Sequence, residues 1–205
     1  MRSHLATALC FLCVMLVFMT PFQSHARKDR TTISYLIGFP TGELNDFIDD
    51  TSYQGLEIDF TTPMSNEQHE MGLLLGFQRF KKSESNATHT DSSTGTVITG
   101  DQERSFDTWP VLFKWRMNPW KSGSINGFFG AAAGVAYVER RFFVGSFNFS
   151  NYGWQILLRP EIGATYMLSD NGGIEASLRY DYGFKTSALP SYGAVTVGIG
   201  YAIFY

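Results

Sequence analysis

The last eleven residues, Val195-Thr-Val-Gly-Ile-Gly-Tyr-Ala-Ile-Phe-Tyr205, decide the fold class. Large apolar or aromatic residues occupy every second position, and smaller residues fill most positions between them. This period of two is typical of a β-strand with two different faces, because successive side chains point to opposite sides of a sheet. Working back along the chain, the same period predicts seven more strands, within 33–39, 56–60, 71–77, 109–117, 127–138, 154–166 and 174–184.

The connections between these strands alternate in length. Short turns rich in Pro, Asn, Ser and Gly are expected at 63–67, 118–124 and 169–172, and longer polar loops at 40–52, 82–100, 139–151 and 186–191. This alternation defines an up-and-down meander with one short-turn end and one long-loop end. No Pro/Gly linker interrupts the pattern and no helical period is present, so we expect a single domain.

The amino terminus has the pattern of an export signal. A basic start at Arg2 precedes an uncharged apolar run from Leu5 to Met19, and Ser24-His-Ala26 ends the segment with small residues. The run is shorter than the roughly 20 residues that a membrane-spanning helix needs. We therefore expect residues 1–26 to be a cleaved secretory signal peptide and residues 27–205 to be the mature domain.

Composition excludes several classes of protein. The chain has 205 residues, of which 17% are charged and 16% aromatic, and a formal charge of −3. That charge is too low for a disordered chain, and without a basic excess we expect no nucleic-acid partner. Both cysteines, Cys10 and Cys13, lie in the expected signal, so the mature domain must fold without disulfides or thiolate metal sites.

The polar face of the strands carries charges of both signs among small residues. Such a face suits the narrow, filled interior of a small barrel, where opposite charges neutralise one another. We expect ten residues to form this interior charge network: Glu57, Asp59, Glu70, Lys114, Arg116, Arg159, Glu161, Glu175, Arg179 and Asp181.

The apolar face has aliphatic residues at mid-strand and aromatic residues toward the strand ends. Aromatic rings sorted in this way are typical of the two interfaces of a lipid bilayer. We expect one girdle at the long-loop end, with Trp109, Trp154, Tyr182 and Tyr192, and one at the short-turn end, with Trp115, Trp120, Tyr166 and Tyr205. A closed barrel also satisfies every strand hydrogen bond in lipid.

The C-terminal stretch resembles the assembly signal of Gram-negative outer-membrane barrels, which end on an aromatic residue, usually Phe rather than the Tyr found here. The matching positions are Val197, Ile199, Tyr201, Ile203 and Tyr205. The segment Tyr35-Leu-Ile-Gly-Phe-Pro-Thr-Gly42 is similar to the first strand and loop of the small porin-like or opacity-protein-like barrels.

The resemblance implies an all-β fold, an eight-stranded antiparallel up-and-down transmembrane β-barrel. It implies a place in the bacterial outer membrane, with the long loops facing the exterior. The implied partners are outer-membrane lipid and lipopolysaccharide, the outer-membrane barrel-assembly machinery, and a host or environmental surface ligand at the long loops.

Three functions fit this architecture. We expect a structural or surface-interaction (adhesin-like) role, with a narrow porin for small polar solutes as the alternative. A lipid A-modifying enzyme is the remote alternative, in which His89 would act with Asp91 and Ser92. With His69 and His89 as the only mature histidines, we expect no catalytic site, no metal site and no cofactor.

Two further features bear on the surface and on the interior. Arg140-Arg-Phe-Phe143 lies toward the outer rim, where it could meet anionic lipopolysaccharide or simply end a strand.

In the hairpin around residue 170, even-numbered residues of both strands face lipid, so opposed residues must have numbers with an even sum. A three-residue loop, Ser169–Asn171, gives a sum of 340 and predicts two inward ion pairs, Arg159–Asp181 and Glu161–Arg179.

Overall fold

The computed structural model describes residues 28–64, 68–90, 97–144 and 147–205, and their side chains except those of residues 86–90, 97–99 and 121. The expected signal peptide, residues 1–26, lies outside this part. The described elements are β1 (Arg30–Thr41), α2 (Glu43–Phe47), β2 (Gln54–Pro63), β3 (His69–Thr90), β4 (Val97–Ser122), β5 (Ile125–Val144), β6 (Phe147–Ser169), β7 (Gly172–Gly183) and β8 (Tyr192–Phe204). Among the described residues, no helix is long and apolar enough to cross a membrane.

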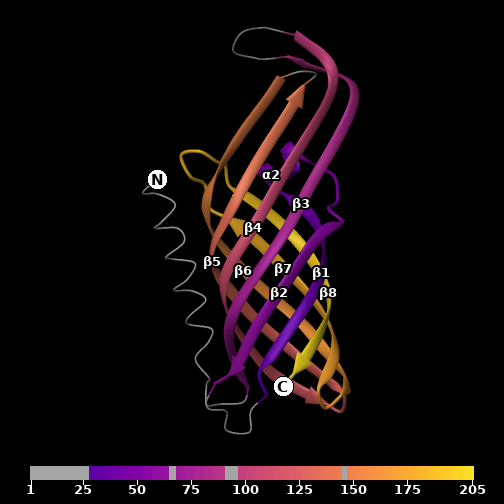
Figure 1. Cartoon of the computed structure of the whole chain (residues 1–205), viewed down its shortest axis with the longest axis vertical. Helices are drawn as coiled ribbons and strands as arrows, with labels where there is room; N and C mark the ends of the chain where they lie inside the picture. The colour runs from indigo at the N-terminus through magenta and orange to yellow at the C-terminus, as the bar shows by residue number, and fades with distance from the viewer. Residues whose placement is uncertain (1–27, 65–67, 91–96, 145–146) are drawn as a thin grey trace, which may run out of the picture.

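The eight strands form one closed antiparallel barrel in sequence order (Figure 1), which confirms the predicted fold class. The barrel closes where β1 pairs with β8, from Arg30 opposite Phe204 to Thr41 opposite Gly193. The backbone N–H of Tyr205 donates to the carbonyl oxygen of Asp29 at 3.0 Å. The described start and end of the chain therefore lie side by side at the short-turn end, as an even number of strands requires.

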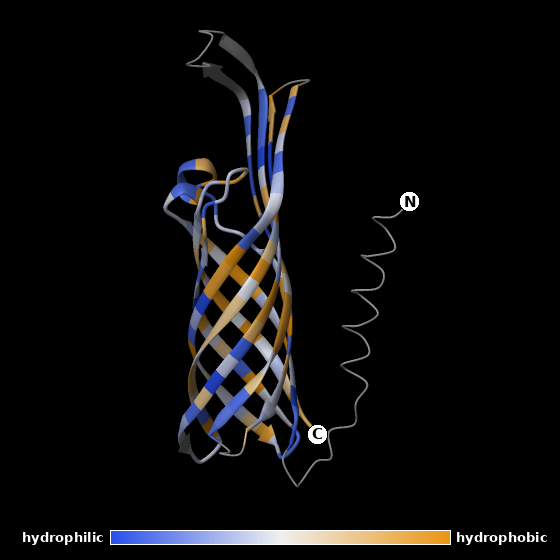
Figure 2. Ribbon diagram, turned by 90° about the vertical axis from the view of Figure 1, so that its left-hand side faces the viewer, coloured by the Kyte–Doolittle hydropathy of each residue, from blue (hydrophilic) through white to orange (hydrophobic). Residues whose placement is uncertain are grey.

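The two faces of the wall differ in the predicted direction. In β3, Leu74 points inward and is fully buried, whereas its neighbour Leu75 is 42% exposed on the outside. In β7 the burial alternates without a break from Gly173 to Gly183. Figure 2 shows hydrophobic and hydrophilic segments alternating along the wall, and the large apolar side chains lie outside. A protein with charges inside and an apolar exterior is suited to lipid rather than to water.

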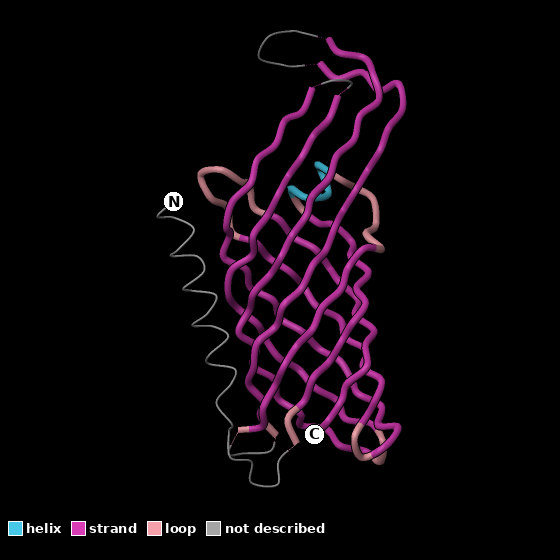
Figure 3. The backbone as a smooth tube through the Cα atoms, in the orientation of Figure 1, coloured by secondary structure: helices cyan, strands magenta, loops and turns pink. Residues whose placement is uncertain are grey.

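Four strands are much longer than the other four. β3, β4, β5 and β6 have 22, 26, 20 and 23 residues, whereas β1, β2, β7 and β8 have 12, 10, 12 and 13. Their outer parts continue beyond the barrel mouth as a curved four-stranded sheet (Figures 1 and 3). We call this sheet the blade and define it as residues 80–90, 97–106, 140–144 and 147–153.

The blade corrects the prediction of long polar loops at 82–100 and 139–151. β3 continues to Thr90, β4 begins at Val97, β5 ends at Val144 and β6 begins at Phe147. These segments lack a regular alternation of apolar and polar residues because a sheet beyond the membrane has no face that lipid covers. Both of its faces can therefore carry polar side chains.

The predicted loop at 40–52 contains α2, which was not expected. It has five residues, too few for a helical period to be recognised, and it follows Gly42, whose positive φ of 57° suits glycine. In Figure 3 this helix, in cyan, lies at the mouth of the barrel below the blade. The loop expected at 186–191 is present and begins two residues earlier, because β7 ends at Gly183 and β8 begins at Tyr192.

The turn between β6 and β7 has the predicted register but a different construction. Leu158 pairs with Tyr182 and Glu161 pairs with Arg179, which confirms the sum of 340. The turn itself has two residues, Asp170 and Asn171, and a bulge between Met167 and Ser169 supplies the shift that we assigned to a three-residue loop. A bulge changes the parity of pairing without lengthening the turn.

Candidate functional site

The membrane-embedded interior of the barrel is divided into two layers. The layer near the short-turn end contains all ten predicted interior charges, of which nine are buried and Glu70 is partly buried. Arg30, the first residue of β1, joins them and is also buried. The network thus has six acidic and five basic side chains.

Glu57 on β2 links two arginines of the opposite wall. Arg159 and Arg179 both donate to the Glu57 carboxylate, and Arg159 also donates to Asp181. The predicted Arg159–Asp181 ion pair is therefore confirmed. Because the lumen is narrow, arginines can reach across it to strands that are distant in the barrel order.

The second predicted pair forms differently. Glu161 and Arg179 are opposed in the ladder, but Arg179 is directed to Glu57. The Glu161 carboxylate instead lies 3.0 Å from Lys114 Nζ, and Lys114 also donates to Asp59 at 2.9 Å. Cross-strand register predicts which residues are neighbours on adjacent strands. The ion-pair partners of Glu161 and Arg179 instead come from strands that are not adjacent in the barrel wall.

A third cluster surrounds Glu175 near the short-turn end. Arg30 and Arg116 both donate to its carboxylate, the latter at 2.9 Å. The Arg116 guanidinium also lies 3.2 Å from the centre of the Phe128 ring. Arg30 was missed in the sequence, because Thr31 and Thr32 beside it obscure the alternation that marks the start of β1.

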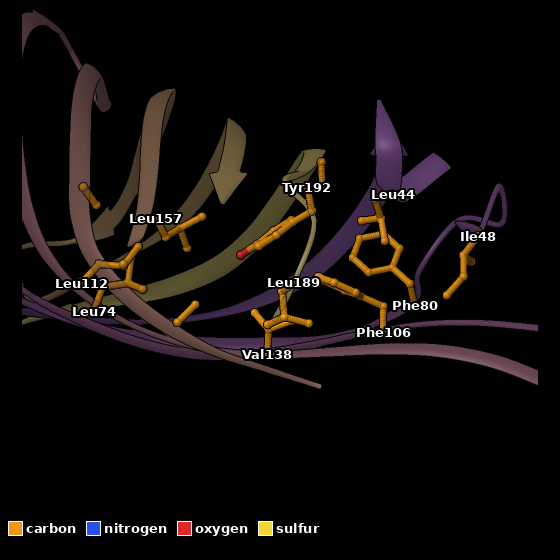
Figure 4. Packing of buried hydrophobic residues seen from close by; sticks show 13 residues of the cluster. Leu44, Ile48, Leu74, Phe80, Phe106, Leu112, Val138, Leu157, Leu189 and Tyr192 are labelled. Carbon is orange, nitrogen blue, oxygen red and sulfur yellow. The ribbon is translucent and has the colours of Figure 1, made fainter. Parts of the chain in front are cut away.

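The layer toward the blade is apolar. Thirteen buried residues form one cluster there: Leu44, Ile48, Leu74, Phe80, Phe106, Leu112, Ala132, Ala136, Val138, Leu157, Leu189, Tyr192 and Ala194. Figure 4 shows their side chains converging from the wall, from α2 and from the loop after β7. Leu44 and Ile48 therefore bring the α2 segment over the lumen, and Leu189 does the same for the 184–191 loop.

Tyr192 corrects one expectation about the aromatic girdles. It is 3% exposed and packs edge-on against Phe106, with ring centres 4.9 Å apart. Its even number places it on the inward face of β8, together with Ala194 and Thr196. The parity of the last strand predicts this placement, which its aromatic character alone does not.

The remaining girdle residues lie on the outer surface. Trp109 packs between Phe77 and Tyr137 with its ring tilted against both, and Tyr137 contacts Trp154, with ring centres 5.5–5.8 Å apart. This aromatic row crosses β3 to β6 just below the blade. Trp154, Tyr182, Trp120, Tyr166 and Tyr205 are exposed, and Trp109 and Trp115 are partly exposed. The C-terminal positions Ile199, Tyr201, Ile203 and Tyr205 also face outward.

A compact set of charges lies directly above the aromatic row. Asp107 is fully buried beneath Arg79, which binds it through two hydrogen bonds of 2.6 and 2.9 Å, and Arg141, which binds it at 3.0 Å. Arg141 also binds Glu139. Arginine and aromatic side chains in adjacent rows are what the headgroup region of a membrane favours.

The histidines do not form a recognisable catalytic site in the described part. His69 lies beside Trp115 at the short-turn end, with ring centres 5.7 Å apart. The His89 side chain and residues Asp91 and Ser92 lie outside the described residues. Within the described residues, no three His, Cys, Asp or Glu side chains are grouped in a way that could hold a metal ion.

The blade has two edges without a neighbouring strand in the described residues. β3 pairs with β2 only as far as Arg79, and β6 pairs with β7 only as far as Leu157. The β3 edge carries Lys81, Lys82 and Glu84, whereas residues 147–154 of the β6 edge contain no charge. Unpaired backbone groups on an uncharged edge readily pair with another strand.

Comparison with known proteins identifies the class of fold. No protein-family model and no curated protein matches the sequence. Neisserial surface protein A is similar over 87% of this chain and 97% of that chain, with a TM-score of 0.55 and 11% identity. Ail, the attachment invasion locus protein of Yersinia pestis, has a TM-score of 0.53 and 13% identity over 88% of this chain and 100% of that chain.

A major outer membrane protein from Thermus thermophilus is similar over 88% of this chain and 100% of that chain, with a TM-score of 0.58 and 14% identity. At such identities the likeness establishes the fold. The chain has the fold of the small outer-membrane β-barrels.

Proposed function

We propose that this protein is an integral outer-membrane barrel with a surface-interaction, adhesin-like role, and that the blade is its binding element. The observation that carries the proposal is the uncharged β6 edge, which extends beyond the membrane-embedded wall. Its side chains are well exposed, with Phe147 and Phe149 at 57% and Tyr152 at 63%. An extended segment of a partner could add to this edge by main-chain hydrogen bonds.

The membrane setting of the proposal follows from the surface. The apolar wall and aromatic girdles favour outer-membrane lipid, and the guanidinium groups of Arg79 and Arg141 above them favour contact with lipopolysaccharide at the headgroup level. The exposed aromatic C-terminal strand is suited to recognition by the barrel-assembly machinery.

The narrow-porin alternative has less support. Leu74 and Leu112 fill the apolar layer with no exposed surface, and the charged layer below is occupied by ion-paired side chains. An eight-stranded barrel has room for little more than its own side chains. Single-channel conductance of the purified protein would reverse this ranking.

The test uses a deletion strain complemented with wild-type protein or with one of two matched variants. Ser150→Lys places a charge on the β6 edge, and Ser83→Lys places the same charge on the same face at the β3 edge. We expect deletion and Ser150→Lys to reduce adhesion to host or environmental surfaces, and Ser83→Lys to leave it near the wild-type level. Equal adhesion of all four strains would refute the proposal.

A further inference from the structure

Two arginines on the inner face of the blade differ from the other arginines of the described residues. Six of these eight arginines lie within 4.0 Å of a carboxylate. Arg104 on β4 and Arg140 on β5 have no such partner within the described part of the chain. Both are partly exposed, and both lie beyond the aromatic row, outside the membrane.

The structure nevertheless holds these two guanidinium groups in place. Arg140 lies over the Phe47 ring, 3.8 Å from its centre, and Arg104 lies 5.3 Å from the centre of the Phe142 ring. Arg104 also donates to the carbonyl oxygen of Phe47 at 3.2 Å. Contact with a phenyl ring and a carbonyl oxygen orients a guanidinium but leaves most of its five N–H donors available.

Carboxylates lie near this face but, among the described residues, none is within 4.0 Å of either arginine: Glu43 acts on Arg140, and Asp49 and Glu84 interact with Arg104. Arg104 is directly opposite Lys82 in the ladder, and like charges in that position are destabilising. Lys82 is neutralised by Asp49 at 2.7 Å and Glu84 at 2.8 Å. Partial burial, together with the nearby Arg104, lowers the pKa of Arg140, although Glu43 acts in the opposite direction. Arg140 therefore carries a charge that its surroundings do not fully compensate.

An aromatic surface adjoins the two arginines. Phe142 is opposite both Arg104 on β4 and Phe149 on β6, and the Phe142 and Phe149 rings stack with centres 6.4 Å apart. Two forked cations beside flat apolar rings match a sugar ring that carries an acidic group. The inner face overhangs α2 and the barrel mouth rather than the surrounding lipid (Figures 1 and 3).

We propose that Arg104 and Arg140 form an oxyanion-binding site for an acidic polysaccharide outside the cell. The two guanidinium groups bind a carboxylate, sulfate or phosphate group of the polymer through paired N–H donors, and the Phe142–Phe149 surface supports the adjoining sugar ring. The site is separate from the β6 edge, so it does not depend on strand addition there.

The test measures binding of a carboxylated oligosaccharide, oligogalacturonate, to the full mature barrel in phospholipid bilayers at physiological ionic strength. Neutral dextran serves as the uncharged probe. The Arg104→Gln/Arg140→Gln double variant is compared with Lys81→Gln/Lys185→Gln, which removes the same charge from exposed positions elsewhere. Heat-dependent mobility on denaturing gels confirms that each variant is folded, and the single variants Arg104→Gln and Arg140→Gln are used if the double variant is not.

We expect saturable binding of oligogalacturonate that falls about tenfold or more in the arginine variant and less than about twofold in the lysine control. Equal losses in the two variants, unchanged binding in the arginine variant, or equal binding of dextran would overturn the site. Competition by polyglutamate as strong as by oligogalacturonate would replace the polysaccharide with an acidic protein. If the barrel did not bind free oligogalacturonate but did bind lipopolysaccharide when that lipid was included in the bilayer, the oxyanion would belong to the lipid instead.

Discussion

The four long strands run through both the barrel body and the blade, but their side chains meet different surroundings in the two regions. In the body, each strand has two neighbours, an apolar outer face and a filled interior. In the blade, the sheet is open and much of both faces meets water. Its ion pairs are exposed, as with Lys81 and Glu103 at 3.0 Å, and two of its arginines have no carboxylate within 4.0 Å in the described residues. The same backbone pairing therefore encloses a buried interior in the body, whereas in the blade it leaves side chains and strand edges exposed.

This contrast predicts that equal substitutions have unequal effects in the two regions. A buried charge has no water to replace a lost partner, whereas an exposed charge does. A buried leucine leaves a cavity, whereas lipid fills the space left on the outer wall. The predictions below test the contrast in order of expected effect.

The largest effect is expected for Glu57→Ala. It leaves Arg159 and Arg179 without their shared carboxylate in the interior, and we expect the free energy of unfolding to fall by about 3–5 kcal/mol. Glu103→Ala is the control from the blade, where an exposed pair contributes about 0–1 kcal/mol. Urea unfolding of the refolded protein in lipid vesicles measures both, and similar losses would contradict the contrast.

A smaller effect is expected in the apolar layer. Leu112→Ala removes a side chain with no exposed surface, and we expect a loss of about 2–5 kcal/mol in the same unfolding measurement. Val111→Ala, one position along the strand, changes a side chain that is 44% exposed on the lipid side and should cost less than about 1 kcal/mol. If Val111→Ala were the more damaging variant, the inner and outer faces of β4 would have to be exchanged.

The same contrast explains which features the sequence alone could predict. Alternation marks a strand where one face is buried and the other is not, so residues 109–117 were predicted and residues 97–106 of the same strand were not. Residues 139–144 were missed in the same way. Where one face of a strand meets lipid and the other meets the lumen, apolar and polar residues alternate in the sequence. Where both faces meet water, this alternation is absent and the strand is not predicted.

The interior charges were predictable as a set but not as pairs. Parity and hairpin register place Arg159 opposite Asp181, because both depend on neighbouring strands alone. The partners of Arg179 and Glu161 depend on how the closed barrel brings β2 and β4 toward β6 and β7, which no local pattern contains. The two arginines of the blade were visible in the sequence, but their lack of a carboxylate partner became apparent only from the structure.

The smallest effect concerns the contact between the blade and the segment that covers the lumen. Lys82 on the blade binds Asp49, which follows α2, and Glu84 on its own strand. These bonds raise the pKa of Lys82 to about 12, and hydrogen bonding to Lys82 lowers the pKa of Asp49 and of Glu84. The carboxylates therefore stabilise the contact above their ordinary pKa near 4, and that contribution is lost as the pH falls through their lowered values.

The contribution of Lys82 to the contact depends on pH in the opposite direction to that of the carboxylates. Its contribution is complete below about pH 10.5 and is lost as the pH rises through about 12, so the contact is intact between roughly pH 5 and 10. Carbon-detected NMR of the Asp49 carboxyl group should give a titration midpoint below the ordinary value in the wild type. Lys82→Met should raise that midpoint toward the ordinary value while the unfolding free energy stays nearly unchanged, because the pair is exposed. A midpoint unaffected by Lys82→Met would mean that the Lys82–Asp49 contact does not set the pKa of Asp49. The α2 segment would then be held over the barrel mouth by Leu44, Ile48 and the contacts of Phe47.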